Sequence, residues 1–496
     1  MQDIANTWFN QAVSIWSDDP HQVAVAAAKL EQARALSTDP RIAIHLAAMY
    51  IKMNRNGDAT SVYREAMHDD PADVELSYHA GAHVLRHGRT DDIRAFFENL
   101  AKIRPADPLA NMVLGVHRQF PSYVHQVTSE IGAAAAGRRR FILCCALWGE
   151  SFIRDFLRYT VAALLSPDNV PVLSERYDVH FVVFTTPKDE VALRADPIFK
   201  RLVQLAKPHF VHIDPFMIEC ARSPHYMIAA HTKFSLMSCS HYVALEAGRR
   251  LDAEVMNIGA DNILNDGFLA NAAKILEGDV SVVAVPGFRL YRDKVLAEID
   301  GRYRRKDGVI EVPMREFARL LCDHIPDSCF VDSERFTRFP LFLCWRVADE
   351  GVLVFANHYM PYIVRARFLK GPLSPSIDPV DGRFLFREMP DLSKMHLVRD
   401  AEIAVFDAGD NPLVEEPPAD RNILDTREVG LWLWCYWDAL RERYFRAGLR
   451  IAKRAPSAAA WEEAEIEARG VVEQIMAHTQ TLEAGNRQRR TWNFAP

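Results

Sequence analysis

The chain has 496 residues, 49% of them hydrophobic and 25% charged, with a net charge of −7 and a pI near 6.2. This composition is typical of a globular protein with two to four domains. The acidic balance argues against the basic surface that nucleic-acid-binding proteins use, so we expect no nucleic-acid partner.

Targeting and cysteine motifs point to an ordinary cytoplasmic protein. The N-terminus, MQDIANTWFNQ, has no basic region followed by an apolar stretch, so we expect no signal peptide. The longest apolar runs, such as YTVAALL, fall short of the ~20 residues of a transmembrane helix. The 8 cysteines include no CxxC pair, which predicts buried free thiols in place of a zinc or redox site.

The first part of the chain, residues 1–117, has a helical pattern that repeats. Pro40, Pro71 and Pro105 lie 31 and 34 residues apart. Counted back from these prolines, small and aromatic residues fall at equivalent packing positions: Ala28 and Ala35 in the first repeat, Ala47, Tyr50, Ala59, Tyr63 and Ala66 in the second, and Ala80, Gly81, Phe97 and Leu100 in the third. The pattern resembles tetratricopeptide repeats, with a generic helical bundle as the alternative. Such repeats present a surface that binds a protein or peptide.

The remaining chain divides into three predicted segments. Residues 118–138 hold no sustained apolar period and predict a linker. Residues 139–415 alternate apolar runs with helical patterns, which predicts an α/β domain with a mostly parallel sheet covered by helices. Its predicted strands are 140–149, 180–186, 209–215, 253–261 and 281–290. Residues 416–496 predict a helical extension, in which Trp432, Trp434 and Trp437 are interpreted as core anchors against the main domain.

Polar residues follow the predicted strands, at the edge of the sheet where ligands bind in such folds. The fourth strand ends in ADNILNDG, which contains Asp261 and Asp266. No dinucleotide-binding, phosphate-loop, nucleophile-elbow or HExxH motif is present. Carboxylates at a strand tip favour a hard cation such as Mg²⁺ or Mn²⁺, which completes its shell with phosphate oxygens and water. Arg289, after the fifth strand, is a candidate for pairing with a phosphate.

Several segments of the α/β domain resemble a group of bacterial glycosyltransferase-like proteins of the GT-A type. The segments are WGESFIRDFL, LLSPDNVPVL, ADNILNDGFL, PGFRLYRD, ANHYMPYIV and SPSIDP, in this order between residues 139 and 410. The resemblance implies that Asp261 binds a metal or the donor diphosphate, and that Trp148 and Glu150 lie near the nucleotide. It also implies that His358 and Asp378 approach the donor or acceptor. The usual DxD pair is absent, because Asn262 and Ile263 follow Asp261.

Each candidate residue also has a structural interpretation. Asp261 could cap a helix that begins near Ile263, and Asp266 with Gly267 could form a turn. Glu150 could be favoured only by a helix N-terminus, and Arg289 could form a surface ion pair.

The leading hypothesis is a cytoplasmic hexosyltransferase-like enzyme. It would transfer a sugar from a nucleotide-sugar donor to a glycan or protein acceptor held partly by the helical repeats, with Mg²⁺ or Mn²⁺ as a candidate cofactor. Asp266, His358 and Asp378 are the candidate catalytic groups. One alternative is a scaffold or binding protein with a degenerate transferase domain, which the missing DxD pair favours. A nucleotidyltransferase-like enzyme is the third hypothesis.

Overall fold

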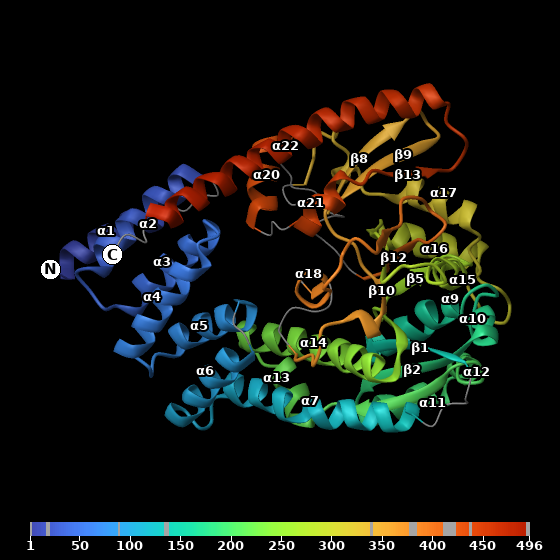
Figure 1. Ribbon diagram of the computed structural model, residues 1–496, viewed down its shortest axis with the longest axis horizontal. Coiled ribbons are helices and arrows are strands. Elements are labelled where there is room, and N and C mark those ends of the chain that lie inside the picture. The colour runs from blue at the N-terminus through green and yellow to red at the C-terminus, as the bar shows by residue number, and fades with distance from the viewer. Residues whose placement is uncertain are drawn as a thin grey trace.

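The computed structural model describes residues 2–15, 20–87, 90–132, 138–337, 341–375, 384–409, 423–435 and 439–492. Within these ranges a helical N-terminal region leads into an α/β region, and a long C-terminal helix returns to the first helices (Figure 1). The predicted fold class, a mostly parallel sheet covered by helices with helical regions before and after it, is confirmed.

The N-terminal region consists of helices that follow one another closely along the chain. They are α1 (Gln2–Ser14), α2 (Pro20–Arg34), α3 (Pro40–Lys52), α4 (Asn56–Asp69), α5 (Val74–His87) and α6 (Thr90–Ile103). Successive helices pack against each other. Pro40 begins α3, where its missing amide hydrogen costs nothing, and the Asp39 side chain accepts the amide of Arg41.

The predicted packing positions of the second and third repeats are buried, from Ala47 to Leu100. A Cβ on Gly81 would lie 3.1 Å from the ring of Phe97, so the glycine lets that ring pack closely. The predicted register of the first repeat is wrong, because Ala28 and Ala35 are exposed. Helix α2 ends well before Pro40, whereas α4 and α6 end two residues before their prolines, so counting back from Pro40 shifts the register.

Helix α7 (Pro108–Gly132) occupies most of the segment 118–138, for which the sequence predicts a linker. It runs beside α14 (Tyr226–Leu251) and contacts strand β3 (Lys207–His212), burying Val124, Val127 and Ile131. Pro121 inside the helix interrupts the sequence signal but not the helix itself. The helical region therefore continues directly onto one face of the sheet.

The main sheet has seven strands within the described residues, in the order β11-β6-β10-β4-β1-β2-β3. Their bounds are β1 (Arg139–Ala146), β2 (Tyr177–Thr185), β3 as given above, β4 (Ala253–Asn257), β6 (Val282–Ala284), β10 (Tyr362–Arg365) and β11 (Met395–Leu397). Only β10 is antiparallel to its neighbours. The first four predicted strands are confirmed. The predicted strand 281–290 is instead two strands in different sheets, β6 and β7 (Gly287–Arg289), because Pro286 has no amide hydrogen to continue the ladder.

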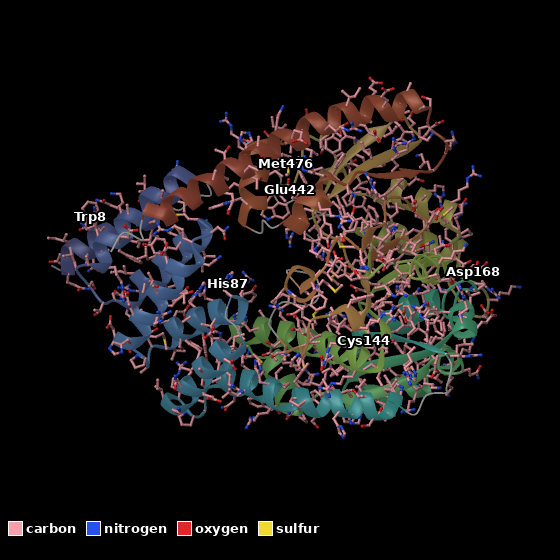
Figure 2. All side chains as sticks on the ribbon, in the orientation of Figure 1. Trp8, His87, Cys144, Asp168, Glu442 and Met476 are labelled. Carbon is pink, nitrogen blue, oxygen red and sulfur yellow. The ribbon has the colours of Figure 1, made fainter. Side chains whose placement is uncertain are left out.

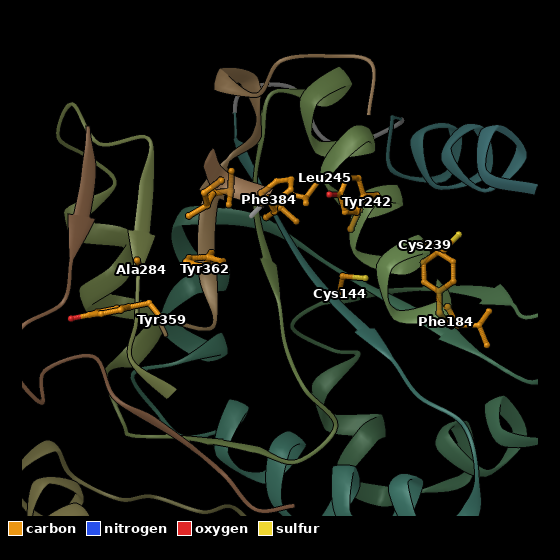
Figure 3. Close-up of a cluster of buried hydrophobic side chains, with 14 of the residues drawn as sticks. Cys144, Phe184, Cys239, Tyr242, Leu245, Ala284, Tyr359, Tyr362 and Phe384 are labelled. Carbon is orange, nitrogen blue, oxygen red and sulfur yellow. The ribbon is translucent and has the colours of Figure 1, made fainter. Parts of the chain in front are cut away.

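Helices cover both faces of this sheet. On one face lie α7, α13 (Pro215–Ala221) and α14. The other face is covered by α8 (Glu150–Asp155), the π-helical turn Phe156–Val161, α9 (Ala162–Leu164), α10 (Val170–Arg176), α12 (Pro197–Leu202) and α15 (Phe268–Ile275). Along β1, Ile142 and Cys144 face α14, whereas Leu143 and Cys145 face the other layer. Figure 3 shows Cys144, Cys239 and Tyr242 in the α14 layer.

The predicted free thiols are confirmed among the described residues. Cys144, Cys145, Cys220, Cys239, Cys329 and Cys344 are buried and unpaired. No helix in the described part of the chain has both the length and the apolarity to cross a membrane.

Two small sheets complete the α/β region. One has the order β5-β12-β7, with β5 (Asn262–Leu264) and β12 (Val405–Asp407). The other has the order β13-β9-β8, with β13 (Leu449–Ala452), β9 (Gly351–Ala356) and β8 (Phe342–Val347). The segment from 352 to 368 contains two strands, β9 and β10, that belong to different sheets.

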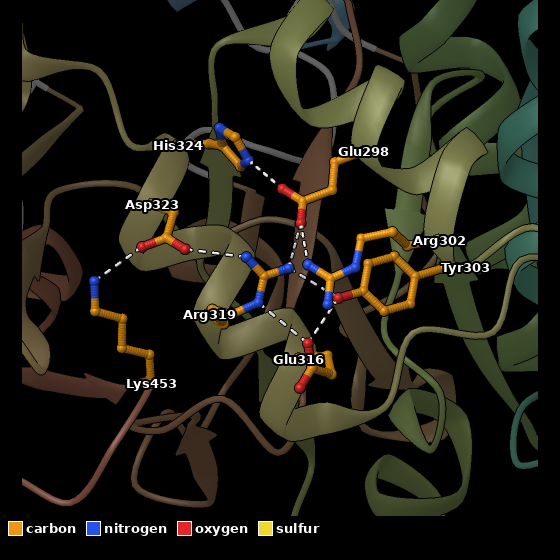
Figure 4. Close-up of polar contacts among 8 residues, drawn as sticks. All are labelled: Glu298, Arg302, Tyr303, Glu316, Arg319, Asp323, His324 and Lys453. Carbon is orange, nitrogen blue, oxygen red and sulfur yellow. Dashed lines mark hydrogen bonds and ion pairs between the residues drawn. The ribbon is translucent and has the colours of Figure 1, made fainter.

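Helices α16 (Arg292–Arg302) and α17 (Met314–His324) lie beside these sheets. Figure 4 shows the polar network that joins them. Glu298 of α16 contacts Nη2 of Arg319 at 2.5 Å and Nε2 of His324 at 2.9 Å. Lys453, which follows β13, lies 2.9 Å from Asp323. The network fixes α16, whose first residue is part of the site described below.

The C-terminal extension contacts both the N-terminal helices and the α/β region. It contains α20 (Thr426–Cys435), α21 (Ala439–Arg446) and α22 (Ala458–Trp492). Trp434 and Leu482 pack among the N-terminal helices, whereas Met476 and Trp432 pack in the cluster around β8 and β9. Figure 2 labels Met476 on α22 and Trp8 on α1. Trp432 is a core anchor against the α/β region as predicted, whereas Trp434 packs among the N-terminal helices instead. Trp437 lies outside the described residues.

Candidate functional site

The β5-β12-β7 sheet places three residues from distant parts of the chain in one row. Asn262, Asp407 and Arg289 are paired across the three strands. Nδ2 of Asn262 donates a hydrogen bond to Oδ1 of Asp407 at 2.8 Å. Nη2 of Arg289 lies 3.2 Å from Oδ2 of Asp407. Asp407 is therefore held on both sides, by an amide and by a guanidinium, and Arg289 forms the ion pair that its structural interpretation expects.

Asp261 lies immediately before β5 and beside Asp407. Its carbonyl accepts the amide of Ala408 at 2.8 Å, and its carboxyl group hydrogen bonds to the carboxyl group of Asp407. Burial, followed by the negative charge of Asp407, raises the pKa of Asp261 to about 7, against the opposing charge of Arg289. Two carboxyl groups this close need a shared proton or a cation between them. The pair is therefore built to hold one positive charge.

Two glycines let the backbone pack directly on these side chains. A Cβ on Gly409 would overlap Oδ2 of Asp261, and a Cβ on Gly259 would lie 3.0 Å from Oδ1 of the same residue. The amide of Gly259 also donates to Oδ1 of Asn262 at 2.6 Å. The interpretation of Asp261 as a helix cap is wrong, because β5 follows it and the next helix, α15, begins at Phe268.

The helical run after β1 supports both loops of the site. Nε of Arg292 donates to the carbonyl of Ala408 at 2.5 Å, and its Nη2 lies 3.4 Å from Oδ2 of Asp155 on α8. Oγ1 of Thr160 donates to the carbonyl of Ala260 at 2.9 Å. The loops that carry Asp261 and Asp407 are therefore fixed to one helical segment.

His358 lies between β9 and β10, on the side of the site that Arg289 occupies. Burial, then the charges of Arg441 and Arg289, lower the pKa of His358 to about 3. The imidazole is therefore neutral at pH 7. A base is most effective when its pKa lies near the working pH, so His358 is a weaker candidate base than the Asp261–Asp407 pair.

The structure does not bring Asp266 to Asp261. Asp266 lies at the other end of β5, where its Oδ1 accepts the amide of Asp168 at 3.0 Å and its own amide donates to Val312 at 2.9 Å. Gly267 follows with a φ of 88°, a conformation that favours glycine. These contacts are those of the turn that the sequence offers as an alternative.

Within the described residues, Trp148 and Glu150 form no hydrogen bond or ion pair with Asp261 or Asp407. Trp148 is partly buried against the cluster under α7 and α14, and Glu150 is exposed at the start of α8. Between them, Gly149 has a φ of 93° and donates its amide to Oδ2 of Asp189 at 3.1 Å, which ties the loop after β1 to the start of α11 (Pro187–Ala195). Asp378 lies outside the described residues.

The donor set of the pair matches a hard cation. Asp261 and Asp407 supply carboxylate oxygens, and Mg²⁺ or Mn²⁺ commonly takes two such ligands with water and phosphate oxygens. Within the described ranges there is no group of three or more His, Cys, Asp or Glu side chains that could hold a metal. Any cation here would therefore depend on ligands from water or a substrate.

Asp407 was not among the residues predicted from the sequence. Its segment, IAVFDAGD, is a short apolar run that ends in acidic residues and a glycine, like the end of β4. That signal could have identified it.

Comparisons with known proteins find similarity among solved structures. No protein-family model and no curated protein sequence matches the chain. Among solved structures, the chain is similar to a mutant of the O-GlcNAc transferase of Thermobaculum terrenum, with 12% identity, a TM-score of 0.20, and coverage of 47% of this chain and 44% of that one. It is also similar to the apo form of mouse xyloside xylosyltransferase 1, with 9% identity, a TM-score of 0.22, and coverage of 34% and 60%. The chain thus spans less than two thirds of either protein, and alignments at these TM-scores carry no argument about its function.

Proposed function

We propose that the protein is a glycosyltransferase of the GT-A type that binds a nucleotide-sugar donor. Asp261 and Asp407 hold the donor's diphosphate through Mg²⁺ or Mn²⁺. The observation that carries this proposal is the hydrogen-bonded carboxyl pair beyond the end of β4. Ligands of mostly parallel sheets bind at that edge.

The charge of the site supports a diphosphate ligand. Asp261 and Asp407 would hold a cation in place of their shared proton, and its charge would neutralise a leaving diphosphate. Arg289, which is about one third exposed and lies beside Asp407, adds a guanidinium that pairs well with phosphate oxygens. Both groups therefore favour the same ligand chemistry.

Asp407 also answers the main objection raised by the sequence. Asp261 lacks the second acid of a DxD pair, which favours a scaffold without activity. In the fold, Asp407 supplies a second carboxylate beside Asp261, from a strand far away in the chain. In a DxD motif the two carboxylates are close because they are neighbours in the sequence. Here strand pairing brings the carboxylates of Asp261 and Asp407 close together.

In the proposed reaction an acceptor hydroxyl attacks the anomeric carbon of the donor sugar, the bond to the diphosphate breaks, and the hydroxyl proton passes to a base. The helical repeats continue through α7 onto the main sheet. An acceptor bound by the repeats is therefore held next to the α/β region.

The test is a thermal-shift screen of the purified chain against UDP-, GDP-, CMP- and dTDP-sugars and nucleoside triphosphates, with and without Mn²⁺. A ligand at 100 times its Kd stabilises the fold by about 2.7 kcal/mol. We expect a Mn²⁺-dependent shift with one nucleotide sugar, which Asp261→Asn abolishes. Asp349→Asn, an exposed turn residue, is the matched control and should keep the shift. A shift with triphosphates alone would favour a nucleotidyltransferase, and no shift with any nucleotide would favour the scaffold.

A further inference from the structure

A surface pocket of about 550 Å³ lies beside α8, the start of α12 and the loop 304–308. Its apolar lining is formed by Ile153, Leu157 and Ile198, and its guanidinium groups belong to Arg154, Arg158, Arg201 and Arg304. We propose that this pocket binds a small anionic molecule, one that carries a phosphate or carboxylate group on an apolar body. The proposed transferase reaction gives this pocket no role, although its lining includes Glu150, which the family resemblance places near the nucleotide.

Two of the arginines share one carboxylate. Arg304 Nη2 lies 2.6 Å from Asp300 Oδ1, and Arg158 pairs with the other oxygen of Asp300. Both guanidiniums also lie over the ring of Tyr159, at 5.4 and 5.3 Å from its centroid. Burial alone would raise the pKa of Asp300, but hydrogen bonds from Arg304 and Arg158 outweigh it and lower that pKa. Asp300 is therefore fully ionised, yet it neutralises only one of the two cations.

The same sharing occurs twice more around the pocket. Asp307 lies 3.2 Å from Arg201 and 3.4 Å from Arg305, which also contacts Glu311. Asp155 lies 3.6 Å from Arg154 and 3.4 Å from Arg292.

Two further acids, Asp196 and Glu150, line the pocket. The carboxylate of Asp196 accepts the amides of Ile198 and Phe199 at the start of α12, and Glu150 is exposed. The lining thus contains four arginines and three acids, Glu150, Asp196 and Asp307. An anion that enters the pocket meets guanidinium groups whose carboxylate partners are shared.

The volume and lining of the pocket restrict the kind of molecule that it can bind. Guanidinium groups bind phosphate and carboxylate in a forked geometry, and small-molecule pockets have volumes of roughly 300–1,000 Å³ with mainly apolar linings. A bare phosphate ion would leave the side chains of Ile153, Leu157 and Ile198 uncovered. A molecule with an aromatic or aliphatic body beside its anionic group uses both parts of the surface.

The pocket is separate from the carboxyl pair, although one helical segment contacts both. Asp155 supports the loop that carries Asp407 through its contact with Arg292. Thr160 hydrogen bonds directly to the loop that carries Asp261. Arg154 and Arg158, from the same segment, line the pocket. The inference therefore does not depend on the proposed transferase activity.

The experiment is calorimetric titration of the full chain with phenyl phosphate and with inorganic phosphate at low salt. We expect phenyl phosphate to bind about tenfold more tightly than inorganic phosphate, since only the former covers the apolar residues. Arg201→Gln and Arg158→Gln should each weaken phenyl phosphate binding by about tenfold. Arg201→Lys should recover only part of the loss, because lysine keeps the charge without the fork.

Two control variants make the result decisive. Arg302→Gln removes an exposed guanidinium that pairs with Glu298 outside the pocket, and should leave binding unchanged. Asp261→Asn should also leave it unchanged. The proposal is overturned if phenyl phosphate does not bind, if both pocket variants bind it normally, or if Asp261→Asn abolishes binding, which would place the ligand at the carboxyl pair. Should Arg158→Gln fail to fold, Arg201→Gln, at a half-exposed ion pair, decides alone.

Discussion

The carboxyl groups of Asp261 and Asp407 hydrogen bond to each other at the edge of the β5-β12-β7 sheet. The two residues are 146 positions apart in the chain, and the pairing of β12 with β5 brings them together. Because the pair holds one proton or one cation, its charge depends on both pH and metal concentration. The predictions begin from this property.

The pair should make the protein less stable as the pH rises. The pKa of Asp261 is raised from 3.8 to about 7, so between these values the folded state keeps a proton that the unfolded state releases. The resulting stabilisation is fully present below about pH 4 and is lost as the pH rises to about 7. Asp261→Asn, which is neutral at every pH, should therefore be more stable than the wild type at pH 8 by about 1–2 kcal/mol, allowing for partial exposure.

Urea unfolding at pH 5 and pH 8 measures this difference. Saturating Mn²⁺ at pH 8 should return the wild type to the stability of the variant or above it, because the cation replaces the proton. A variant that is less stable than the wild type at pH 8 would show that the two carboxylates do not repel each other in the folded protein.

A buried pair of histidines should have the opposite pH dependence. Nδ1 of His209 lies 3.0 Å from Oε2 of Glu130 on α7, and its Nε2 lies 3.0 Å from Nδ1 of His180. Nε2 of His180 lies 3.2 Å from Oδ2 of Asp178, whose other oxygen accepts Nζ of Lys207 at 2.7 Å. Two hydrogen bonds link Glu130, His209 and His180, and two neutral imidazoles supply the two protons that these bonds need, whereas Nε2 of His180 and Oδ2 of Asp178 are buried without a hydrogen-bond partner. Burial lowers the pKa of both histidines, that of His180 to about 4, so both imidazoles are neutral at pH 7.

The unfolded chain takes up protons on these histidines near pH 6.5, before the folded protein does. Stability is therefore lost as the pH falls from about 6.5 towards 4, by about 2 kcal/mol at pH 5. Denaturant melts between pH 5 and 7, run in the Asp261→Asn background, should show a weaker slope in a His180→Asn, His209→Gln double variant. His212→Gln, a half-exposed histidine on the same strand, is the control. An unchanged slope in the double variant would contradict neutral, buried histidines.

Gly409→Ala should impair the site without unfolding the protein. The new Cβ would overlap Oδ2 of Asp261 and push this carboxyl group away from Asp407. We expect the Mn²⁺-dependent thermal shift to be lost, while the Tm without ligand falls by a few degrees at most. Gly57→Ala, at the start of α4 where nothing lies within 4 Å, is the matched control. If Gly409→Ala keeps full Mn²⁺ binding, the close packing of this loop is not needed.

Trp434→Ala should loosen the C-terminal helices from the N-terminal ones. Trp434 is 4% exposed, packs among the N-terminal helices, and its Nε1 lies 3.3 Å from Oε2 of Glu483 on α22. Loss of this contact should cost about 3–5 kcal/mol. Small-angle scattering should show a larger radius of gyration for this variant.

Trp432→Ala is the comparison for that experiment, because Trp432 packs against the cluster around β8 and β9 instead. It should lower the Tm without changing the radius of gyration. Equal scattering curves for the wild type and Trp434→Ala would mean that other contacts hold the two ends together.

The sequence predicted those parts of the molecule whose signals are local. Strands β1 to β4 are buried on both faces, so they appear as continuous apolar runs, and Asp261 follows the last of them. Strands β5, β7 and β12 have three residues each, too few for a periodic signal. Their pairing is what brings Asp407 to Asp261, so this contact could not be read from spacing.

The position of His358 depends on packing in the same way. A Cβ on Gly287 would overlap the carbonyl of Met360, so the segment after β9 lies directly on β7, the strand that carries Arg289. The linker prediction failed for a different reason, because Pro121 lies within α7 and breaks the apolar period without breaking the helix. In both segments, tertiary contacts determine a structure that the local sequence pattern does not specify.

The most direct test of the central claim is calorimetric binding of UDP, GDP, CDP and dTDP in the presence and absence of Mn²⁺. Wild-type protein should bind one of them only when Mn²⁺ is present, and both Asp261→Asn and Asp407→Asn should abolish that binding. Metal-independent binding that both variants retain would contradict a cation held between Asp261 and Asp407.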